Sequence, residues 1–174
     1  MIKQDTFENR AKIAYLAIGS NLGNRIHNIN IAKAKLELQN VKIIKCSGNY
    51  ESLSWPKIQN PKFINIVIKI ETLLLPEKLL IICNKIENEL GRTKTSKNEP
   101  RTCDIDIIDF DNKVYKSTKK DHLNLPHPEL TKRNFVLLPL YEISKIWRHP
   151  KTNVKINELI SLLNVDDLNA IKHV

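Results

Sequence analysis

Two aspartates, Asp104 and Asp106, alternate with the apolar residues Cys103, Ile105 and Ile107 in a short segment of the chain. Alternation with a period of two is typical of a β-strand with one buried face, so both carboxylates are expected on the same face of a sheet. Carboxylate oxygens at this spacing can converge on a hard cation. The pattern indicates magnesium-dependent chemistry on a phosphate compound, although an isolated Asp-x-Asp pair more often only solubilises the outer face of a sheet.

Basic residues crowd the segment directly before these aspartates. Arg92, Lys94, Lys97 and Arg101 lie there, opposed by Glu99. Guanidinium groups bind phosphate oxygens through paired hydrogen bonds, and the aspartates would hold a metal ion beside them. The combination predicts a phosphate clamp next to a metal site. Without the aspartates, a solvated charged loop would be the simpler interpretation.

Other residues are suited to a flat, phosphorylated substrate. His127, in a turn stiffened by prolines, could donate to a phosphate oxygen, and Arg133 could neutralise a terminal phosphate. Phe63 and Phe135 could stack on the two faces of a heterocycle while Asn65 satisfies its polar edge. Each type of residue also has a common structural role, because a lone loop histidine and isolated phenylalanines usually stabilise the fold.

The elements that must position these residues follow from hydrophobic periodicity and from helix and turn signals. The predicted strands lie at 13–18, 41–50, 62–70 and 103–110, and the predicted helices at 25–39, 76–91, 133–143 and 156–163. A turn at 111–113 is expected to fold the aspartate strand into a short hairpin. The order predicts an α+β fold, a ferredoxin-like βαββαβ sandwich with C-terminal additions.

One face of the predicted sheet is expected to be free. In the ferredoxin-like arrangement both helices cover the same face of an antiparallel sheet. The isoleucines that alternate over 64–70 should contact those helices. Phe63 and Asn65 then lie on the uncovered face, where the two aspartates can join them, and a register shift of one residue would reverse this arrangement.

Length and charge place broad limits on the protein. The chain has 174 residues, enough for one well-filled core, and we predict a loose polar extension over 1–11 and a single domain over 12–174. Lys and Arg number 28 against 19 Asp and Glu, and the formal net charge of +9 favours anionic partners such as nucleotides, nucleic acid or a membrane surface. Lysine is abundant along the whole chain, however, so a compositional bias can account for much of this excess.

The cysteines and the hydropathy pattern indicate the compartment. Cys46, Cys83 and Cys103 have no metal-like spacing, and each falls in an apolar segment where a small hydrophobic side chain fits. An odd number of thiols is typical of a reducing compartment. No apolar run reaches the length of a membrane span, and the N-terminus lacks the apolar core of a signal peptide. We therefore expect a cytoplasmic protein without a membrane partner.

Several motifs follow one another in a specific order. They are Ala-Ile-Gly-Ser-Asn-Leu-Gly at 17–23, Gln-Asn-Pro-Lys-Phe-Ile-Asn at 59–65, Glu87 with Gly91 and Arg92, Pro-Arg-Thr-Cys-Asp-Ile-Asp at 100–106, and Leu-Pro-His-Pro at 125–128 with Arg-Asn-Phe-Val-Leu at 133–137. In order and spacing, from residue 13 to about 160, the chain resembles the 6-hydroxymethyl-7,8-dihydropterin pyrophosphokinase family. The resemblance implies an enzyme of folate biosynthesis that moves the terminal pyrophosphate of ATP onto the pterin hydroxymethyl group and releases AMP.

The resemblance also implies roles for individual residues. Asp104 and Asp106 would bind two Mg²⁺ ions, with Arg92 and Arg101 as further catalytic residues. The implied ATP-binding residues are Asn84, Glu87, Arg92, Lys94, Arg101, Ile107, His122, His127 and Arg133. The implied pterin-binding residues are Ser52, Leu53, Phe63, Asn65 and Phe135. The chain departs from the family pattern before Pro100, where neither Trp nor Gly precedes the proline, and at Lys94, which stands where an arginine is common.

The sequence leaves two other functions to consider. The same topology serves RNA-binding domains through aromatic residues on the open sheet face, so a basic nucleic-acid-binding module is the alternative. The basic, aromatic strand signature of such domains is absent, and Asp104 and Asp106 would repel phosphates unless a metal intervened. A catalytically silent ligand-binding domain is disfavoured because so many site residues match together. We expect a monomer that binds the small molecules ATP and hydroxymethyl dihydropterin, and no nucleic acid.

Overall fold

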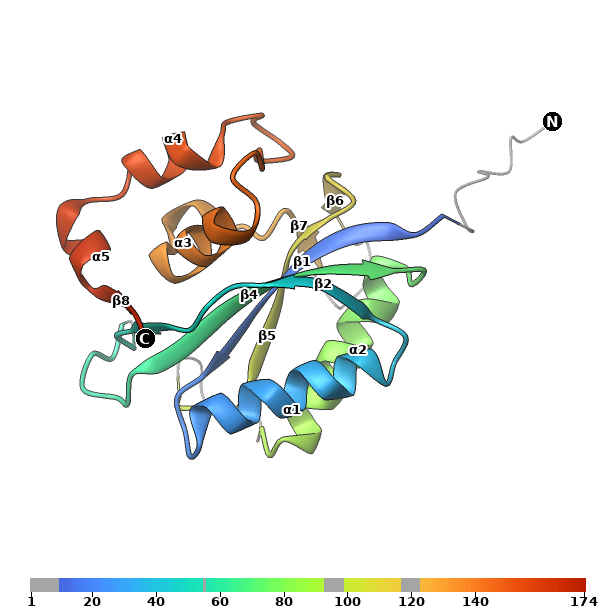
Figure 1. Ribbon diagram of the computed structural model, residues 1–174, viewed down its shortest axis with the longest axis horizontal. Coiled ribbons are helices and arrows are strands. Elements are labelled where there is room, and N and C mark those ends of the chain that lie inside the picture. The colour runs from blue at the N-terminus through green and yellow to red at the C-terminus, as the bar shows by residue number, and fades with distance from the viewer. Residues whose placement is uncertain (1–9, 55, 93–98, 117–122) are drawn as a thin grey trace.

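The computed structural model describes residues 10–54, 56–92, 99–116 and 123–174 (Figure 1). The elements in chain order are β1 (Lys12–Ser20), α1 (Arg25–Glu37), β2 (Lys42–Cys46), β3 (Tyr50–Ser52), β4 (Phe63–Thr72), α2 (Pro76–Glu89), β5 (Asp104–Phe110), β6 (Tyr115–Lys116), β7 (Asn124–Leu125), a 3₁₀ turn (Leu130–Lys132), α3 (Asn134–Ile143), α4 (Ile156–Ser161), α5 (Val165–Asn169) and β8 (Ile171–His173). None of the helices in these described parts is long and apolar enough to span a membrane.

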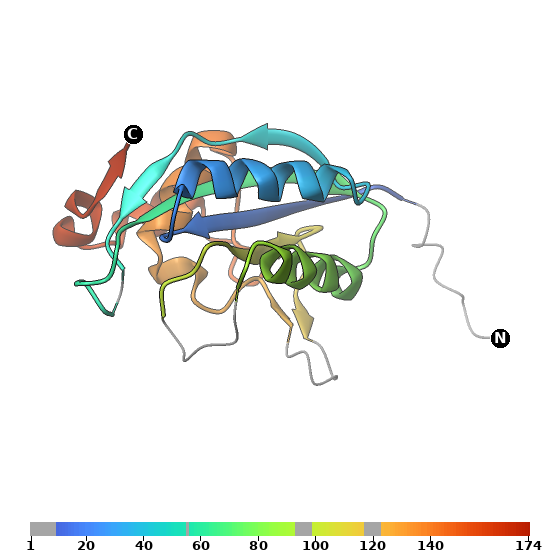
Figure 2. The same ribbon diagram turned by 90° about the horizontal axis from the view of Figure 1, so that it is seen from below.

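The central sheet has the strand order β5-β1-β4-β3-β8, with β2 also paired to β4. Every pairing in it is antiparallel. Helices α1 and α2 lie side by side on one face of the sheet (Figure 2). The four predicted strands, observed as β1, β2 with β3, β4 and β5, therefore have the arrangement of a split βαβ unit. The ferredoxin-like prediction is confirmed.

Local sequence signals set the ends of the first two helices. The Asn24 side chain accepts a hydrogen bond from the His27 backbone N–H at 3.1 Å and caps α1. Helix α2 starts at Pro76, where a missing N–H costs nothing. It ends before Gly91, whose φ of +87° allows the Arg92 N–H to bond back to the Glu87 carbonyl at 3.0 Å. This C-terminal turn fixes the backbone of Arg92 beside the end of the helix.

The main core lies between the sheet and the first two helices. It is built from the alternating isoleucines of β4, apolar residues of β1 and β5, and the inner faces of α1 and α2. Ile66, Ile68 and Ile70 are at most 1% exposed. The prediction that the isoleucine face contacts the helices is therefore confirmed, which turns the other residues of β4 toward the opposite face.

The prediction that this opposite face is free is wrong over about half of the sheet. Tyr15, Val67 and Ile108 pack there against α3 and α4 in a second core that includes Leu137 and Leu140. Helix α3 is apolar around most of its circumference, so it gains more from covering the sheet than from exposure to water. Figure 1 shows the resulting three layers, with α1 and α2 below the sheet and α3 above it.

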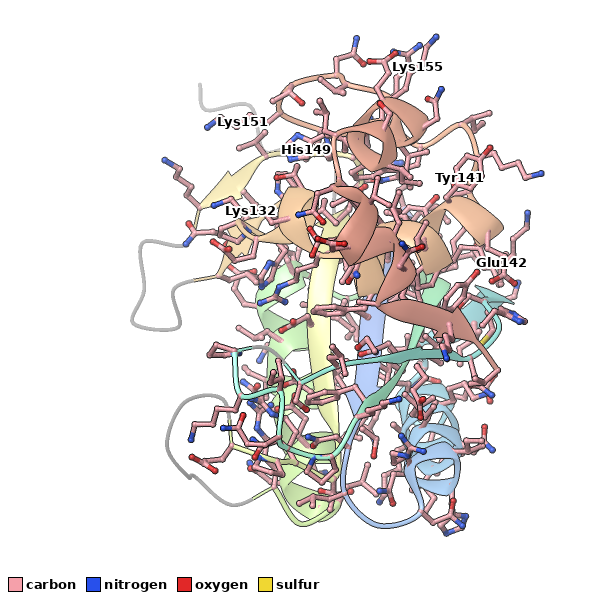
Figure 3. All side chains as sticks on the ribbon, turned by 90° about the vertical axis from the view of Figure 1, so that its left-hand side faces the viewer. Lys132, Tyr141, Glu142, His149, Lys151 and Lys155 are labelled. Carbon is pink, nitrogen blue, oxygen red and sulfur yellow. The ribbon has the colours of Figure 1, made fainter. Side chains whose placement is uncertain are left out.

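The predicted strand at 41–50 is divided into β2 and β3. At the break, Ser47 bonds twice to Val67, through its N–H to the carbonyl at 2.9 Å and through its Oγ to the N–H at 3.0 Å. Glu142 of α3, which is labelled in Figure 3, accepts hydrogen bonds from the Gly48 N–H and the Tyr50 hydroxyl. A Cβ atom on Gly48 would lie 2.1 Å from Nε2 of His173 in β8, so a larger residue there would require the exposed His173 side chain to move.

Two smaller predictions are also wrong in part. Asp111 and Asn112 form a turn with φ of +54° at both residues, but the strand that follows, β6, pairs with β7 and not with β5. Cys83 and Cys103 are buried, whereas Cys46 is exposed because it lies at the end of β2. The three cysteines are free thiols, as expected.

Candidate active site

Strand register brings the candidate residues together on the open half of the sheet. Gly19 of β1 lies opposite Asn65 of β4 on one side and opposite Asp104 of β5 on the other. Two residues earlier in β1, Ala17 lies opposite Asp106 of β5. The structure thus places both aspartates and Asn65 on one face, as the sequence predicts.

Asp104 is held by two arginines from different segments. Its Oδ1 lies 2.8 Å from Nη1 of Arg92 and 3.0 Å from Nη1 of Arg101. The same Arg92 nitrogen lies 2.5 Å from Oε1 of Glu87. Two cations and two carboxylates therefore form one network at the end of α2 and the start of β5.

Glu87 is a structural acceptor within this network. It is 4% exposed, and its Oε1 accepts the backbone N–H of Ile105 at 2.6 Å. Burial raises the pKa of Glu87 to about 7, against the opposing effects of the Ile105 hydrogen bond and of Arg92. Burial lowers the pKa of Arg92, but Asp104 and Glu87 outweigh it and leave that pKa above its ordinary value. Arg92 is therefore a permanent cation at the site.

Asp106 has a separate set of partners from the C-terminal half of the chain. Its Oδ2 lies 2.8 Å from Nη1 of Arg133 and 3.9 Å from Nε2 of His127. The Nδ1 atom of His127 accepts the Glu129 N–H at 3.1 Å, and burial lowers the pKa of the imidazole. A neutral imidazole with an acceptor Nδ1 carries its proton on Nε2, so His127 presents an N–H donor to the site.

An irregularity in β5 places His127 next to the aspartates. The pairing of β1 with β5 shifts between Tyr15 and Leu16, so Ile108 lies in a bulge. The Ile108 carbonyl accepts the backbone N–H of His127 at 2.8 Å. Because Ile108 lies in the bulge, its carbonyl is available to hold the loop that carries His127, here called the histidine loop (residues 126–129).

These residues surround a pocket of about 390 Å³. It is lined by Leu80, Asn84, Glu87, Arg92, Asp104, Ile105, Asp106, Ile107, Leu123, Asn124, His127, Pro128 and Glu129. Arg101 and Arg133 reach it through their ion pairs with the two aspartates. Lys94 and His122, the remaining candidates for the ATP site, lie outside the described residues.

Four of the candidate pterin residues, Ser52, Leu53, Phe63 and Asn65, lie at the same end of the sheet as Asp104. Ser52 pairs with Phe63, and its Oγ accepts a hydrogen bond from Nδ2 of Asn65 at 2.9 Å. Leu53, the next residue, is 41% exposed. Phe135 comes from α3, with the Arg133 guanidinium carbon 5.8 Å from the centre of its ring.

The two aspartates have the chemistry of a Mg²⁺ site that a substrate completes. Both side chains are accessible, at 26% for Asp104 and 34% for Asp106, and both are neutralised by cations that a metal ion can replace. Within the described ranges, no group of three or more His, Cys, Asp or Glu side chains could hold a metal ion by itself. Mg²⁺ is commonly bound by one or two carboxylates together with substrate phosphates, so the donor set fits this ion in the presence of a phosphate ligand.

Sequence reasoning missed two residues that support this site. Asn21, in the turn between β1 and α1, bonds to the backbone of Arg101. Asp109 of β5, 2% exposed, accepts the indole N–H of Trp147 at 2.8 Å and ties the second core to β5. The only signal for Asp109 was an acidic residue where an apolar one would continue the strand.

Asp109 should make the stability of the fold depend on pH. Burial raises the pKa of Asp109 from 3.8 to about 6, against the effect of the Trp147 hydrogen bond. The native state therefore holds the proton more tightly than the unfolded chain, and this stabilisation is complete below about pH 4 and lost as the pH rises through about 6. Asp109→Asn keeps an oxygen for Trp147 without the charge. In urea unfolding, the free energy of unfolding of Asp109→Asn should rise relative to that of the wild type by about 2 kcal/mol between pH 4 and pH 8. A difference between the two proteins that does not change with pH would contradict a buried, titrating Asp109.

Comparison with known proteins identifies the family. A sequence profile described as 7,8-dihydro-6-hydroxymethylpterin-pyrophosphokinase (HPPK) matches residues 15–145. The 2-amino-4-hydroxy-6-hydroxymethyldihydropteridine pyrophosphokinase of Aquifex aeolicus is 42% identical over 136 residues, which cover 78% of this chain and 82% of that protein. The chain belongs to the HPPK family. The Haemophilus influenzae protein of the same name is 36% identical over 148 residues, 84% of this chain and 90% of its own.

Longer proteins also contain a segment similar to this HPPK-family chain. The folic acid synthesis protein fol1 of Pneumocystis carinii is 40% identical over 168 residues, which are 97% of this chain. The chain spans only 20% to 24% of the length of fol1-type proteins. A solved HPPK-DHPS structure from Plasmodium falciparum has a TM-score of 0.72 at 17% identity and covers 98% of this chain and 49% of that one. At this identity the structural match supports the fold alone.

Proposed function

We propose that this chain transfers pyrophosphate from ATP to the hydroxymethyl group of 6-hydroxymethyl-7,8-dihydropterin, giving AMP and the pterin diphosphate in folate biosynthesis. In this reaction the hydroxymethyl oxygen bonds to the β-phosphorus, the bond from that phosphorus to the oxygen bridging to the α-phosphate breaks, and AMP leaves. The observation that carries the proposal is the meeting of Asp104 and Asp106 with Arg92, Arg101 and Arg133 beside a pocket.

The ATP half of the site is formed by the pocket between α2, β5 and the histidine loop. Asn84, Glu87 and Ile107 line it and would bind the nucleoside portion, together with His122. The cations Arg92, Lys94, Arg101 and Arg133 would bind phosphate oxygens. His127 would add a neutral N–H donor, which suits a phosphate oxygen without adding charge.

The pterin half lies beside it on the open sheet face. Phe63 and Phe135 would stack on the two faces of the pterin ring, and this stacking would orient the ring. Asn65 would read the polar edge of the ring, and its position is fixed by the hydrogen bond to Ser52. The backbone of Ser52 and Leu53 would complete the edge contacts.

The aspartates would hold two Mg²⁺ ions, which when bound neutralise the developing charge on the phosphates. Arg92 and Arg101 are ion-paired with Asp104 in the structure, as Arg133 is with Asp106. We propose that these arginines exchange their carboxylate partners for phosphate oxygens when the metal and ATP bind. The arginines then hold the triphosphate in line with the hydroxymethyl oxygen.

The proposal extends to the organisation of the chain. Residues 12–174 would act as a single domain with 1–11 as an extension, and the protein would act as a monomer on small molecules. The free thiols of Cys83 and Cys103 fit a reducing cytoplasm. Nucleic acid is a poor partner for this sheet face because two carboxylates lie on it.

Gly19 makes room for the pterin residues, so Gly19→Ala should weaken pterin binding. A Cβ atom there would lie 3.0 Å from Oδ1 of Asn65, which would have to shift, and at an ordinary contact distance of 3.4 Å from Cδ1 of Phe63. The KM for the pterin should rise about tenfold with a smaller change for ATP. Gly23→Ala is the control, because its φ of +64° costs stability but nothing lies within 4 Å. Equal effects of the two variants on the pterin KM would contradict the steric argument.

Product analysis tests the reaction. The protein is incubated with ATP, Mg²⁺ and 6-hydroxymethyl-7,8-dihydropterin, and the nucleotides and pterins are separated by chromatography. We expect AMP and pterin diphosphate in equal amounts, with no AMP when the pterin is omitted. ADP as the main nucleotide product, or no turnover by the folded protein, would overturn the proposed function.

A further inference from the structure

Asn21 is a buried polar residue that contacts both sides of the candidate site. It follows β1 in the turn before α1 and is 2% exposed. A primary amide offers an acceptor oxygen and two N–H donors, and a buried amide is costly unless these are satisfied. In this structure both ends of the Asn21 amide have partners, and the partners belong to two different loops.

The oxygen end of Asn21 fixes the backbone of Arg101. The backbone N–H of Arg101 donates to the side-chain Oδ1 of Asn21 at 2.7 Å, and the backbone N–H of Asn21 donates to the Arg101 carbonyl at 3.1 Å. From this fixed backbone the Arg101 guanidinium reaches Asp104 at 3.0 Å. Two reciprocal hydrogen bonds thus set the point from which a proposed phosphate-binding side chain extends.

The nitrogen end of Asn21 fixes the loop between β3 and β4. Its Nδ2 donates to Oγ of Ser54 at 3.2 Å and to the carbonyl of Pro61 at 3.0 Å. The Ser54 hydroxyl is buried and itself donates to the Pro61 carbonyl at 2.5 Å. These contacts close the loop near both of its ends, one residue after Leu53 and two residues before Phe63.

We propose that Asn21 is a positioning residue that sets the geometry of the ATP half and the pterin half of the site at the same time, although its own amide is occupied by protein partners. The proposal rests on the function proposed above. Asparagine suits this position because the oxygen serves Arg101 while the nitrogen serves Ser54 and Pro61. Aspartate keeps the first interaction and loses the second, and alanine loses both.

Steady-state kinetics of three variants test this role. Asn21→Ala should raise the KM for ATP about tenfold and the KM for the pterin at least as much, because it removes one side-chain hydrogen bond to Arg101 and two to the loop between β3 and β4. Asn21→Asp should raise the pterin KM about tenfold and the ATP KM less than about threefold, because the Arg101 N–H keeps its acceptor. Asn24→Ala is the matched control, since it removes a helix cap in the same turn and costs stability without touching either loop.

The outcomes separate a positioning role from a structural one. Variants are compared at equal concentrations of folded protein, measured by circular dichroism and thermal unfolding. Unchanged KM values in Asn21→Ala, equal changes for both substrates in Asn21→Asp, or the same changes in Asn24→Ala would overturn the proposal. If the wild type makes AMP and the variants give any of these contradicting results, the positioning role of Asn21 is wrong and the proposed function still stands. If the wild type makes no AMP, the proposed function itself is wrong.

Discussion

Replacing Asp104 or Asp106 by asparagine should lower kcat by about 10³-fold while the protein stays folded. Each carboxylate is partly exposed and lies on the open sheet face, so the core does not depend on its charge. The amide is a weaker ligand for a hard cation, and it also leaves the arginines around it without their anionic partner. The loss should appear in kcat at saturating ATP and pterin, measured as AMP release.

Asp111→Asn provides the matched control for these substitutions. Asp111 follows the same strand and is ion-paired with Arg10, but it lies in the turn beyond Phe110 and away from the pocket. Asparagine tolerates the positive φ of 54° at this position. The control should keep its turnover within about twofold. Near-normal turnover in Asp104→Asn and Asp106→Asn would show that the acidic pair is not at the reacting centre.

Arg92→Lys should reduce kcat/KM for ATP by about 10²-fold although it preserves the charge. The Arg92 guanidinium spans Glu87 and Asp104, and its backbone is fixed by the C-terminal turn of α2. A lysine ammonium is a point charge that cannot present the planar fork to two phosphate oxygens. It also leaves the buried Glu87 with a poorer partner, so both ATP binding and its alignment should suffer.

Arg148→Lys is the control for that change. Arg148 lies in the C-terminal part of the chain, where its guanidinium donates to the Asn153 carbonyl at 3.1 Å. The same chemical substitution there should leave kcat/KM unchanged. If Arg92→Lys retained full activity with ATP, the paired hydrogen bonds proposed for this arginine would be absent from the reaction.

The layers nearest the site could be predicted from the sequence because their periodicity is strong. Alternation in β4 and β5 determines which side chains face the helices. A shift of the strand register by one residue would turn every isoleucine of β4 away from them. Asn24, Pro76 and Gly91 give clear helix ends because each has a specific backbone function.

The C-terminal half was less predictable because its placement depends on long-range contacts. Nothing in the local pattern of α3 says which surface it covers, and the two faces of a sheet are both available to an apolar helix. Strand β8 is three residues long and exists through its pairing with β3. The break at Ser47 depends on two hydrogen bonds to Val67, which no periodicity encodes.

The candidate site shows the same division. The aspartates and the basic segment were evident from residue type and spacing, and the resemblance to the family added Asn84, Glu87 and the pterin residues. The ion pairs that join Arg92 and Arg101 to Asp104, and the bulge that holds His127, required the structure. Asn21 was part of a recognised motif, but its partners are far from it in sequence, so its role could not be read from the motif.

The most direct test of the account is a crystal structure of the protein with Mg²⁺, an unreactive ATP analogue and 6-hydroxymethyl-7,8-dihydropterin. We predict divalent ions bound to both Asp104 and Asp106, the triphosphate held by Arg92 and Arg101, and the pterin ring between Phe63 and Phe135. A complex in which the nucleotide binds elsewhere, or in which both aspartates keep their arginine partners and bind no metal, would contradict it.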